Sequence, residues 1–353
     1  MKGKLIIFNK SGIPMSSEVY EVPTLKEGEI LIKNEYTTLC RSDISTYLGH
    51  RIEKSPTILG HEIVGRIVAL GENIENVFDI PLHVGERVTW AIYAANPKGP
   101  MALKGMPQKS PDLFKYGHEQ VTDTSLFHGG LGEYTILRRY TPVLPLAENI
   151  PLPVASIINC AVSTVAGSLR LAGELSNKRI GIWGTGMLGV IACAMCKVKG
   201  AQAVIGIDKD KSRLNTALRF GATSVYTPQE LEASNESVDI AIDYSGCLQS
   251  MEAGPNHLSI GGTAVWVGGV CPQDKVRIDS EKVIRRLYTI KGLHNYNADD
   301  FKEGVNFITK YWSQYPISEL IYDGFTLDQT EEAFQYAISH NPYRVGIRIG
   351  SDE

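Results

Sequence analysis

Two short motifs and one later cysteine could together bind a metal ion. Cys40 opens the sequence Cys-Arg-Ser-Asp, His61 is the centre of Gly-His-Glu, and Cys160 stands further along the chain. Catalytic zinc is typically held by three protein side chains, often Cys and His, with a fourth position open to water or substrate. Each residue alone is better interpreted as a packed thiol or a core histidine. The ordered set of all three favours a catalytic zinc site.

A glycine-rich segment in the second half of the chain has the spacing of a dinucleotide-binding turn. Ile180–Trp183 is a short apolar run suited to a buried strand, and Gly184, Gly186 and Gly189 follow it directly. Such a turn lets backbone N–H groups approach a pyrophosphate, and the helix that begins there presents its positive end to the phosphates. Asp208 comes at about the 20-residue distance expected for a carboxylate that binds the adenosine ribose hydroxyls. A glycine turn that only packs a helix against a strand is the alternative, but the whole pattern favours dinucleotide binding.

The charged residues at and shortly after Asp208 predict which dinucleotide is used. The carboxylate of Asp208 should repel a 2′-phosphate, so the sequence favours NAD over NADP. The nearby cations Lys209 and Arg213 act in the opposite direction. The residues expected to contact the cofactor are Gly184, Thr185, Gly186, Met187, Leu188, Gly189, Asp208, Arg213 and Gly268.

The elements that must position these residues change character along the chain. Up to about Pro153 the sequence reads as short apolar or alternating strands bounded by Gly, Pro and Asn. These strands are expected at Lys4–Phe8, Glu29–Tyr36, Ile63–Leu70 and Arg87–Ala91. From Ala155 onward strands alternate with helices, which implies a parallel sheet with right-handed crossovers. Here the expected elements are the strands Arg179–Trp183, Ala203–Asp208, Asp239–Asp243, Ala264–Gly268 and Thr289–Gly292 and the helices Met187–Lys199 and Ser212–Phe220. The fold class is therefore α/β, with a β-rich first domain and a doubly wound parallel sheet in the second.

Composition and charge exclude several classes of protein. The 353 residues suffice for about two domains, and a hydrophobic content of 43% with a charged content of 21% is typical of ordinary soluble proteins. No stretch approaches the roughly 20 apolar residues of a membrane span, and the first residues lack the features of a secretory signal. A net charge of −4 without a long basic run gives no reason to expect nucleic acid or a membrane as partner. Six cysteines without a dense framework fit a reducing compartment, so a cytoplasmic location is expected.

These motifs, in this order, resemble those of the zinc-dependent medium-chain alcohol dehydrogenases. The resemblance rests on Cys-x-Ser-Asp at Cys40, Gly-His-Glu at His61, Gly-Gly-Leu-Gly-Glu-Tyr from Gly129, the late Cys160, and the glycine turn with Asp208. It covers nearly the whole chain and implies a GroES-like catalytic domain, built from both ends of the chain, with a Rossmann domain between them. The implied boundaries are residues 1–161 and 294–353 for the catalytic domain and residues 162–293 for the NAD-binding domain.

The resemblance also implies roles for individual residues. The implied zinc ligands are Cys40, His61 and Cys160, with Glu62 as a transient fourth ligand. Asp43 would orient the histidine, and Ser42 would hydrogen-bond the substrate hydroxyl and begin the proton relay. The implied reaction is hydride transfer between an alcohol and NAD, in which zinc lowers the pKa of the alcohol.

Two departures from the family pattern change these expectations. Classical members hold a structural zinc with four close cysteines in a lobe that would fall near Ala94–Asp112, but no cysteine lies between Cys40 and Cys160. We therefore expect one zinc ion per chain and no structural zinc. Ser45 stands where many relatives place a relay histidine, so the proton path is expected to end in water or in the cofactor ribose.

Short strings in four regions suggest a class of substrate. Pro56–Glu62, Pro107–Lys109, Leu113–Glu119 and Lys291–Tyr296 resemble the branch of the family associated with phosphonate metabolism, with cyclitol and polyol dehydrogenases as near relatives. A phosphonate would need cations or hydrogen-bond donors around it. The candidate substrate-binding residues are Arg51, Lys115, His118, His294 and Asn295, each of which, taken alone, is more often solvated surface. The leading interpretation is a zinc-dependent NAD alcohol dehydrogenase for a small polar alcohol, with a phosphonate-bearing alcohol as the candidate.

Two alternatives remain open. A cyclitol or sugar-polyol dehydrogenase would use donors such as His50, Glu62 and Asn295 for hydroxyl groups instead of cations for a phosphonate. A nucleotide-binding protein without turnover is an alternative of another class, although the intact metal-binding set argues against it. By analogy with the family we expect a homodimer through Thr263–Gly268 and Leu287–Lys291, or a homotetramer with a contact at the lobe near Ala94–Asp112.

Overall fold

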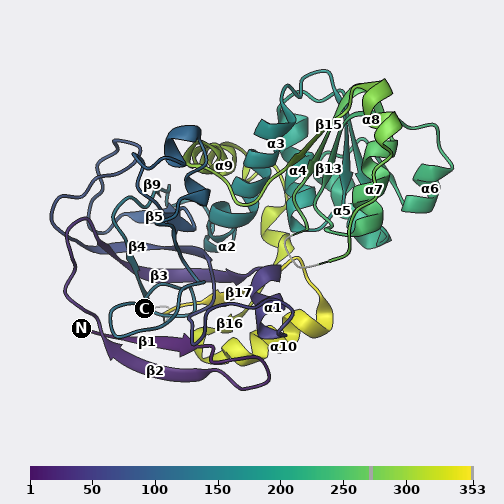
Figure 1. The fold of residues 1–353 in the computed structure, drawn as a ribbon. Coiled ribbons are helices and arrows are strands. Elements are labelled where there is room, and N and C mark those ends of the chain that lie inside the picture. The colour runs from purple at the N-terminus through teal and green to yellow at the C-terminus, as the bar shows by residue number, and fades with distance from the viewer. Residues whose placement is uncertain (270–272, 351–353) are drawn as a thin grey trace. The chain divides into compact units, whose positions relative to one another are not determined.

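The computed structural model describes residues 1–269 and 273–350 (Figure 1). By its internal contacts the chain divides into two compact units. Unit 1 comprises Met1–Cys160, Asn297–Trp312 and Ile317–Glu353, and unit 2 comprises Ala161–Tyr296 and Ser313–Pro316. Unit 1 therefore draws on both ends of the sequence, and unit 2 is almost wholly one continuous segment.

Unit 1 is built on an extended, mostly antiparallel sheet. Along it lie β16 (Ile321–Thr326), β17 (Arg344–Arg348), β3 (Ile30–Leu39), β4 (Glu62–Leu70), β5 (Arg87–Trp90) and β9 (Val143–Pro145), and β8 (Tyr134–Leu137) also pairs with β3. Smaller pairs are formed by β1 (Lys2–Ile7) with β2 (Ser16–Glu21) and by β6 (Tyr93–Ala94) with β7 (Phe114–Lys115). The helices of this unit include α1 (Arg41–Tyr47), α2 (Leu152–Ser156), α9 (Ala298–Tyr311) and α10 (Thr330–His340).

Strand β3 holds unit 1 together because both of its faces are buried. Successive side chains of a strand point to opposite faces of a sheet. Ile30 and Ile32 accordingly belong to one apolar core, which contains Trp90, whereas Leu31 and Leu39 belong to another. Burial of each such side chain contributes about 1.5–3 kcal/mol, so this strand is firmly fixed in its register.

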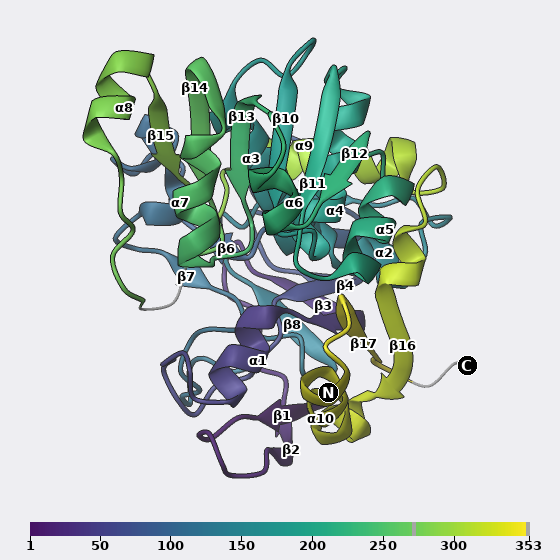
Figure 2. The same cartoon turned by 90° about the vertical axis from the view of Figure 1, so that its right-hand side faces the viewer.

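Unit 2 contains a fully parallel sheet, whose strands lie side by side in Figure 2. Their order is β12 (Ser224–Tyr226), β11 (Ala203–Ile207), β10 (Arg179–Trp183), β13 (Val238–Asp243), β14 (Leu258–Trp266) and β15 (Thr289–Gly292). The helices between these elements are α3 (Ser163–Ala172), α4 (Met187–Val198), α5 (Lys211–Arg219), α6 (Pro228–Glu232), α7 (Leu248–Asn256) and α8 (Ser280–Arg286). This is the strand order of dinucleotide-binding folds, with its reversal between β10 and β13. The predicted fold class, a β-rich domain with a doubly wound parallel sheet, is confirmed.

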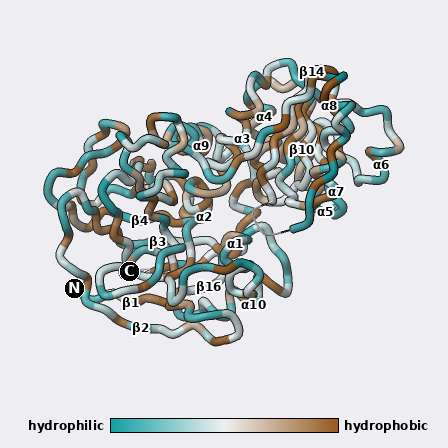
Figure 3. Tube along the Cα trace, in the orientation of Figure 1, coloured by the Kyte–Doolittle hydropathy of each residue, from teal (hydrophilic) through white to brown (hydrophobic). Residues whose placement is uncertain are grey.

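Hydrophobic residues follow the sheets, as Figure 3 shows along β10, and the short segment around α6 is hydrophilic.

Leu152–Ala172 is a continuous helical segment of 21 residues that is long and apolar enough to cross a membrane. The expectation that no stretch approaches this length missed it. However, 83% of its apolar window is buried inside the protein, as in a core helix.

Candidate metal centre and nucleotide site

The pairing of β3 with β4 brings the first two candidate metal ligands together. Thr38 near the end of β3 lies opposite Glu62 at the start of β4. Cys40 directly follows β3 and begins α1, and His61 directly precedes β4. The two residues therefore leave the sheet at the same end, although a long loop separates them in sequence.

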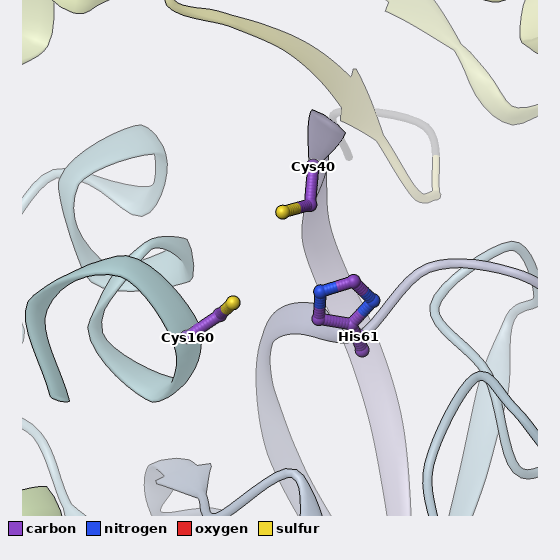
Figure 4. Close-up of side chains that lie close together, drawn as sticks. All are labelled: Cys40, His61 and Cys160. Atoms are coloured by element: carbon purple, nitrogen blue, oxygen red, sulfur yellow. The ribbon is translucent and has the colours of Figure 1, made fainter. Parts of the chain in front are cut away.

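Cys160 completes a compact group of donors. The ligand atoms of Cys40, His61 and Cys160 all lie within 4.8 Å of one another (Figure 4). Cys160 lies in a π-helical turn, Ile158–Val162, inside the long apolar helix. Such turns are rare and occur frequently at functional sites. The structure thus brings together the three residues for which the sequence predicted a zinc site.

The carboxylate of Asp43 contacts the His61 ring on the side away from the two sulfur atoms. Its Oδ1 lies 3.2 Å from Nδ1 of His61. The same carboxylate accepts backbone hydrogen bonds from Cys40, at 2.9 Å, and from Gly60, at 3.2 Å. Because Nδ1 faces Asp43, Nε2 is the ring nitrogen left for a metal, and Figure 4 shows one ring nitrogen turned toward the two sulfur atoms.

The electrostatic environment favours a thiolate at Cys40. A hydrogen bond from Cys160 holds the pKa of the Cys40 thiol well below its usual value, and the positive charge of Arg344 and His61 adds to this effect against the cost of burial. The pKa of Cys160 is raised in return, since it is the hydrogen-bond donor and is buried. A thiolate is the form of cysteine that binds metal. The two thiol groups and the imidazole, whose other nitrogen faces Asp43, fit the donor set of a catalytic zinc ion.

Glu62 is held by a buried ion pair that the sequence did not predict. Arg344 donates from Nε to Oε2 of Glu62 at 2.7 Å and from a terminal nitrogen to Oε1 at 2.9 Å. Thr38 donates a further bond to Oε2 at 2.7 Å. Arg344 also lies 3.6 Å from the sulfur of Cys40. Both oxygens of Glu62 therefore accept hydrogen bonds. To act as the predicted transient zinc ligand, Glu62 would have to leave its ion pair with Arg344.

The predicted relay residue is available for a substrate. Ser42 lies half-buried in the first turn of α1, directly after Cys40 and Arg41. Its hydroxyl makes no hydrogen bond with the residues that the structure describes. Ser45 lies one turn further along the same helix and is also half-buried.

Charged side chains form a chain of contacts that begins at the histidine of the metal group. The His118 ring packs on the His61 ring with centroids 5.1 Å apart. Nδ1 of His118 lies 3.0 Å from Oε1 of Glu53, and the same oxygen forms an ion pair with a terminal nitrogen of Arg51 at 2.6 Å. The sequence missed Glu53, which links two predicted substrate residues. Burial, with the positive charge of Lys115, keeps the pKa of His118 well below its ordinary value.

Lys115 differs from its neighbours because its ammonium group is not paired. It is half-buried in β7, and within the described ranges no ion pair or hydrogen bond satisfies its side chain. Burial and the charge of Arg51 lower the pKa of Lys115, and the negative charge of Glu53 partly offsets this effect. A partly desolvated cation that makes no direct ion pair is a ready partner for an anionic group.

The glycine turn of unit 2 has the conformation that its sequence predicted. Gly184 has a φ of +88°, in the region that favours glycine, and a Cβ there would lie 2.7 Å from the backbone nitrogen of Ser245. A Cβ on Gly189 would collide with the carbonyl oxygen of Gly184, so the third glycine allows close packing of helix α4 on the turn. Gly268 packs in the same way against the backbone of Gly246. The turn follows β10 at the reversal of strand order, where such sheets bind dinucleotides.

Asp208 is tied to this turn. Its Oδ2 accepts hydrogen bonds from the backbone nitrogen of Thr185, at 2.8 Å, and from the Thr185 hydroxyl, at 3.2 Å. Its Oδ1 accepts one from the backbone nitrogen of Asp210 at 3.0 Å. Arg213, on α5, has its Nε 3.8 Å from a carboxylate oxygen of Asp210. Met187 is buried at the start of α4, and Leu188 beside it is half-buried.

The remaining predicted substrate residues belong to unit 2. His294 is exposed, and Asn295 is half-buried with a φ of +58°. Arg51, Lys115 and His118 all lie in unit 1, with the metal group. The lobe near Ala94–Asp112 consists of β6 and two short 3-10 turns, Ala102–Lys104 and Pro107–Lys109.

Two family models match the chain, as an alcohol dehydrogenase GroES-like domain over residues 26–148 and as a zinc-binding dehydrogenase over residues 188–310. The chain belongs to the zinc-dependent medium-chain dehydrogenase/reductase superfamily. D-xylulose reductase A of Aspergillus oryzae is 26% identical over 337 residues, which cover 89% of this chain and 87% of that protein. The crystal structure of an alcohol dehydrogenase from Thermotoga maritima has a TM-score of 0.93 and 21% identity, with 99% of each chain covered. That of L-idonate 5-dehydrogenase from Escherichia coli has a TM-score of 0.83 and 18% identity, with 99% of this chain and 98% of that chain covered. The resemblance noted in the sequence is confirmed at the level of the superfamily, and the protein is an oxidoreductase of the zinc-dependent alcohol dehydrogenase family.

Proposed function

We propose that this superfamily member is an NAD-linked dehydrogenase for a small polar alcohol that carries an anionic group, with a phosphonate as the candidate. The observation that carries this choice is the half-buried ammonium group of Lys115, which makes no direct ion pair among the described residues and lies within electrostatic range of Glu53 and of the predicted zinc ligand Cys160. Burying a charge without a partner is costly, so a bound anion would relieve that cost. Arg51 is already neutralised by Glu53, which leaves Lys115 as the principal anchor.

The roles of the other residues follow from their contacts. Cys40, His61 and Cys160 would hold the zinc ion, which lowers the pKa of an alcohol and polarises a carbonyl group. Ser42 has a free hydroxyl to accept the alcohol proton and pass it outward. Asp43 faces Nδ1 of the imidazole, and so would keep Nε2 available as a ligand.

A substrate panel with a matched pair of variants tests the proposal. NADH formation by the zinc-replete protein is measured with hydroxyalkylphosphonates, cyclitols, linear polyols and simple alcohols. In Lys115→Met we expect KM for the phosphonates to rise about 10- to 100-fold, as befits loss of a charge-assisted hydrogen bond, while neutral alcohols are unaffected. Lys54→Met is the control, because Lys54 is exposed and pairs with Glu119. Equal effects on charged and neutral substrates would refute the anchor.

A second candidate, a cyclitol or sugar-polyol dehydrogenase, is favoured by the relatives named D-xylulose reductase and L-idonate 5-dehydrogenase. Of the polar side chains suggested for its hydroxyl groups, Glu62 already accepts hydrogen bonds from Arg344 and Thr38, and His50 is exposed. This candidate therefore rests on Asn295 and on residues outside the predicted set. Turnover of polyols that is indifferent to Lys115→Met would favour it, whereas binding of zinc and NAD without any turnover would favour the non-catalytic alternative.

The remaining expectations from the sequence stay proposals. They are preference for NAD over NADP, one zinc ion per chain without a structural zinc, a cytoplasmic location, and catalytic and nucleotide domains divided at residues 1–161, 162–293 and 294–353. Assembly as a homodimer or homotetramer also belongs here. β15 lies at the edge of the parallel sheet, and Leu287 before it is 71% exposed, which supports pairing through this edge. Light scattering at assay concentration tests it, and a monomer would count against it.

A further inference from the structure

The Thr185 hydroxyl is directed at the carboxylate of Asp208. Thr185 is fully buried, although it is the second residue of the glycine turn. A Cβ placed on Gly206 of β11 would lie 3.2 Å from the Thr185 methyl group, so that methyl group packs on the strand. The hydroxyl and the backbone N–H both donate to Oδ2 of Asp208. Both branches of the threonine are therefore fixed.

These bonds determine what Asp208 can offer to a nucleotide. An ionised carboxylate has about four acceptor sites. Thr185 occupies those on Oδ2, and the backbone of Asp210 occupies one on Oδ1. One acceptor on Oδ1 and the full negative charge remain. That combination accepts a ribose hydroxyl and repels a 2′-phosphate.

A cation that would favour NADP, Arg213, lies close to the glycine turn. Arg213 lies on the next helix, with its Nε 3.8 Å from Asp210, and one of its terminal nitrogens would be 3.4 Å from a Cβ on Gly186. An arginine in this region accommodates the 2′-phosphate of NADP in related folds. The choice of dinucleotide therefore depends on where the Asp208 carboxylate is held relative to this cation.

We propose that Thr185 is a positioning residue for cofactor selection, whose hydroxyl holds the Asp208 carboxylate where it favours NAD and disfavours NADP. This inference rests on the proposed function, because it assumes that the glycine turn binds a nicotinamide dinucleotide. It goes further in naming the side chain that sets the preference. Thr185 acts through Asp208 and does not itself touch the cofactor.

The test measures binding without turnover. Dissociation constants of NADH and NADPH are determined by fluorescence titration for the wild type, Thr185→Val, Thr185→Ser and Ser212→Ala. Valine keeps the shape of threonine and removes the hydroxyl, serine restores the hydroxyl, and Ser212 donates to Asp210 but makes no bond to Asp208. We expect the preference for NADH to fall about tenfold in Thr185→Val, which corresponds to about 1.4 kcal/mol, and to persist in the other two variants.

The outcomes separate this inference from the proposed function. Failure of the wild type to bind either dinucleotide would overturn the nucleotide part of the proposed function before any variant is considered. Binding of NADH with an unchanged or increased preference in Thr185→Val would overturn only the role of Thr185. A wild type without preference would overturn both that role and the proposed preference for NAD. Thr185→Ala is a second route to loss of the hydroxyl if the valine variant does not fold, and circular dichroism checks the fold of each variant.

Discussion

Protonation of the buried His128 should destabilise unit 1 as the pH falls. The ring is 1% exposed, neither ring nitrogen has a hydrogen-bonding partner among the residues described, and it packs edge-on against Phe114. Burial lowers the pKa of His128 from 6.5 to about 4, and the charge of Arg138 adds slightly to this effect. The folded protein therefore keeps the ring neutral at pH values at which the unfolded chain protonates it. Stability contributed by the neutral ring is complete above about pH 6.5 and is lost progressively down to about pH 4.

The size of this loss follows from the difference between the two pKa values. At pH 5 the unfolded ring is mostly protonated and the folded ring mostly neutral, so the cost is about 2 kcal/mol, rising to about 3 kcal/mol below pH 4. In a unit of this size about 2 kcal/mol corresponds to a change of about 4–8 °C in melting temperature. His128→Phe replaces the ring with an apolar one that cannot protonate. The melting temperature of each protein is compared at pH 8 and at pH 5. We expect the drop between these two pH values to be about 4–8 °C smaller in His128→Phe than in the wild type.

Calorimetry or a dye-based melt of both proteins at the two pH values measures this difference, and the contributions of all other groups cancel between them. His83→Asn is the control for loss of a histidine as such, because His83 is exposed. Identical pH dependence in His128→Phe and the wild type would show that the ring does not remain neutral in the folded protein. The reasoning from burial would then be wrong.

Three further predictions concern the metal centre and the substrate anchor. Asp43→Asn should weaken zinc binding about 10- to 100-fold, because the amide orients the His61 ring less well, and competition with a chelator measures this. Arg344→Ala should destabilise the protein by about 3–5 kcal/mol in urea unfolding by leaving Glu62 buried and unpaired, and Glu62→Gln in the same chain should restore much of the loss. If the double variant is no more stable than Arg344→Ala, the buried charge is not the cause. Burial lowers the pKa of Lys115 from 10.5, so KM for anionic alcohols should rise as the pH increases through the alkaline range below that value; a flat profile would contradict the anchor.

The parts of the fold that local sequence patterns predict are those with buried strands. β10 has the bounds that were expected, because a strand buried on both faces reads as an apolar run between turn residues. β15 also has its expected bounds, although it is a mostly exposed strand at the edge of the sheet. β12 escaped notice because it is three residues long and only half-buried. β14 begins at Leu258, earlier than expected, since Gly261 and Gly262 interrupt its apolar pattern. α7 contains Pro255 near its end, which argued against a helix there.

The candidate site likewise contains residues that the sequence predicts and residues that it does not. Cys40 and His61 stand in short motifs, and the structure brings them and the later Cys160 within one small volume. Glu53 and Arg344 carry no motif, and the contacts of Glu53 with His118 and of Arg344 with Glu62 join residues that are distant in sequence. Thr185 belongs to the predicted set of cofactor residues, but sequence alone gives no indication that its hydroxyl turns away toward Asp208. Hydrogen-bond direction depends on side-chain rotamers that packing selects, and spacing does not report it.

The pairing of β17 with β3 has a consequence for the order of events during synthesis. Arg344 reaches Glu62 across a sequence separation of 282 residues. A nascent chain therefore emerges from the ribosome with Cys40, His61 and Cys160 all translated while the charge of Glu62 still lacks its counterpart. The continuous segment of unit 2, Ala161–Tyr296, is also translated in that interval. Zinc loaded into the finished centre should accordingly arrive late, after release of β17, and a chain arrested before this strand should hold the metal less tightly.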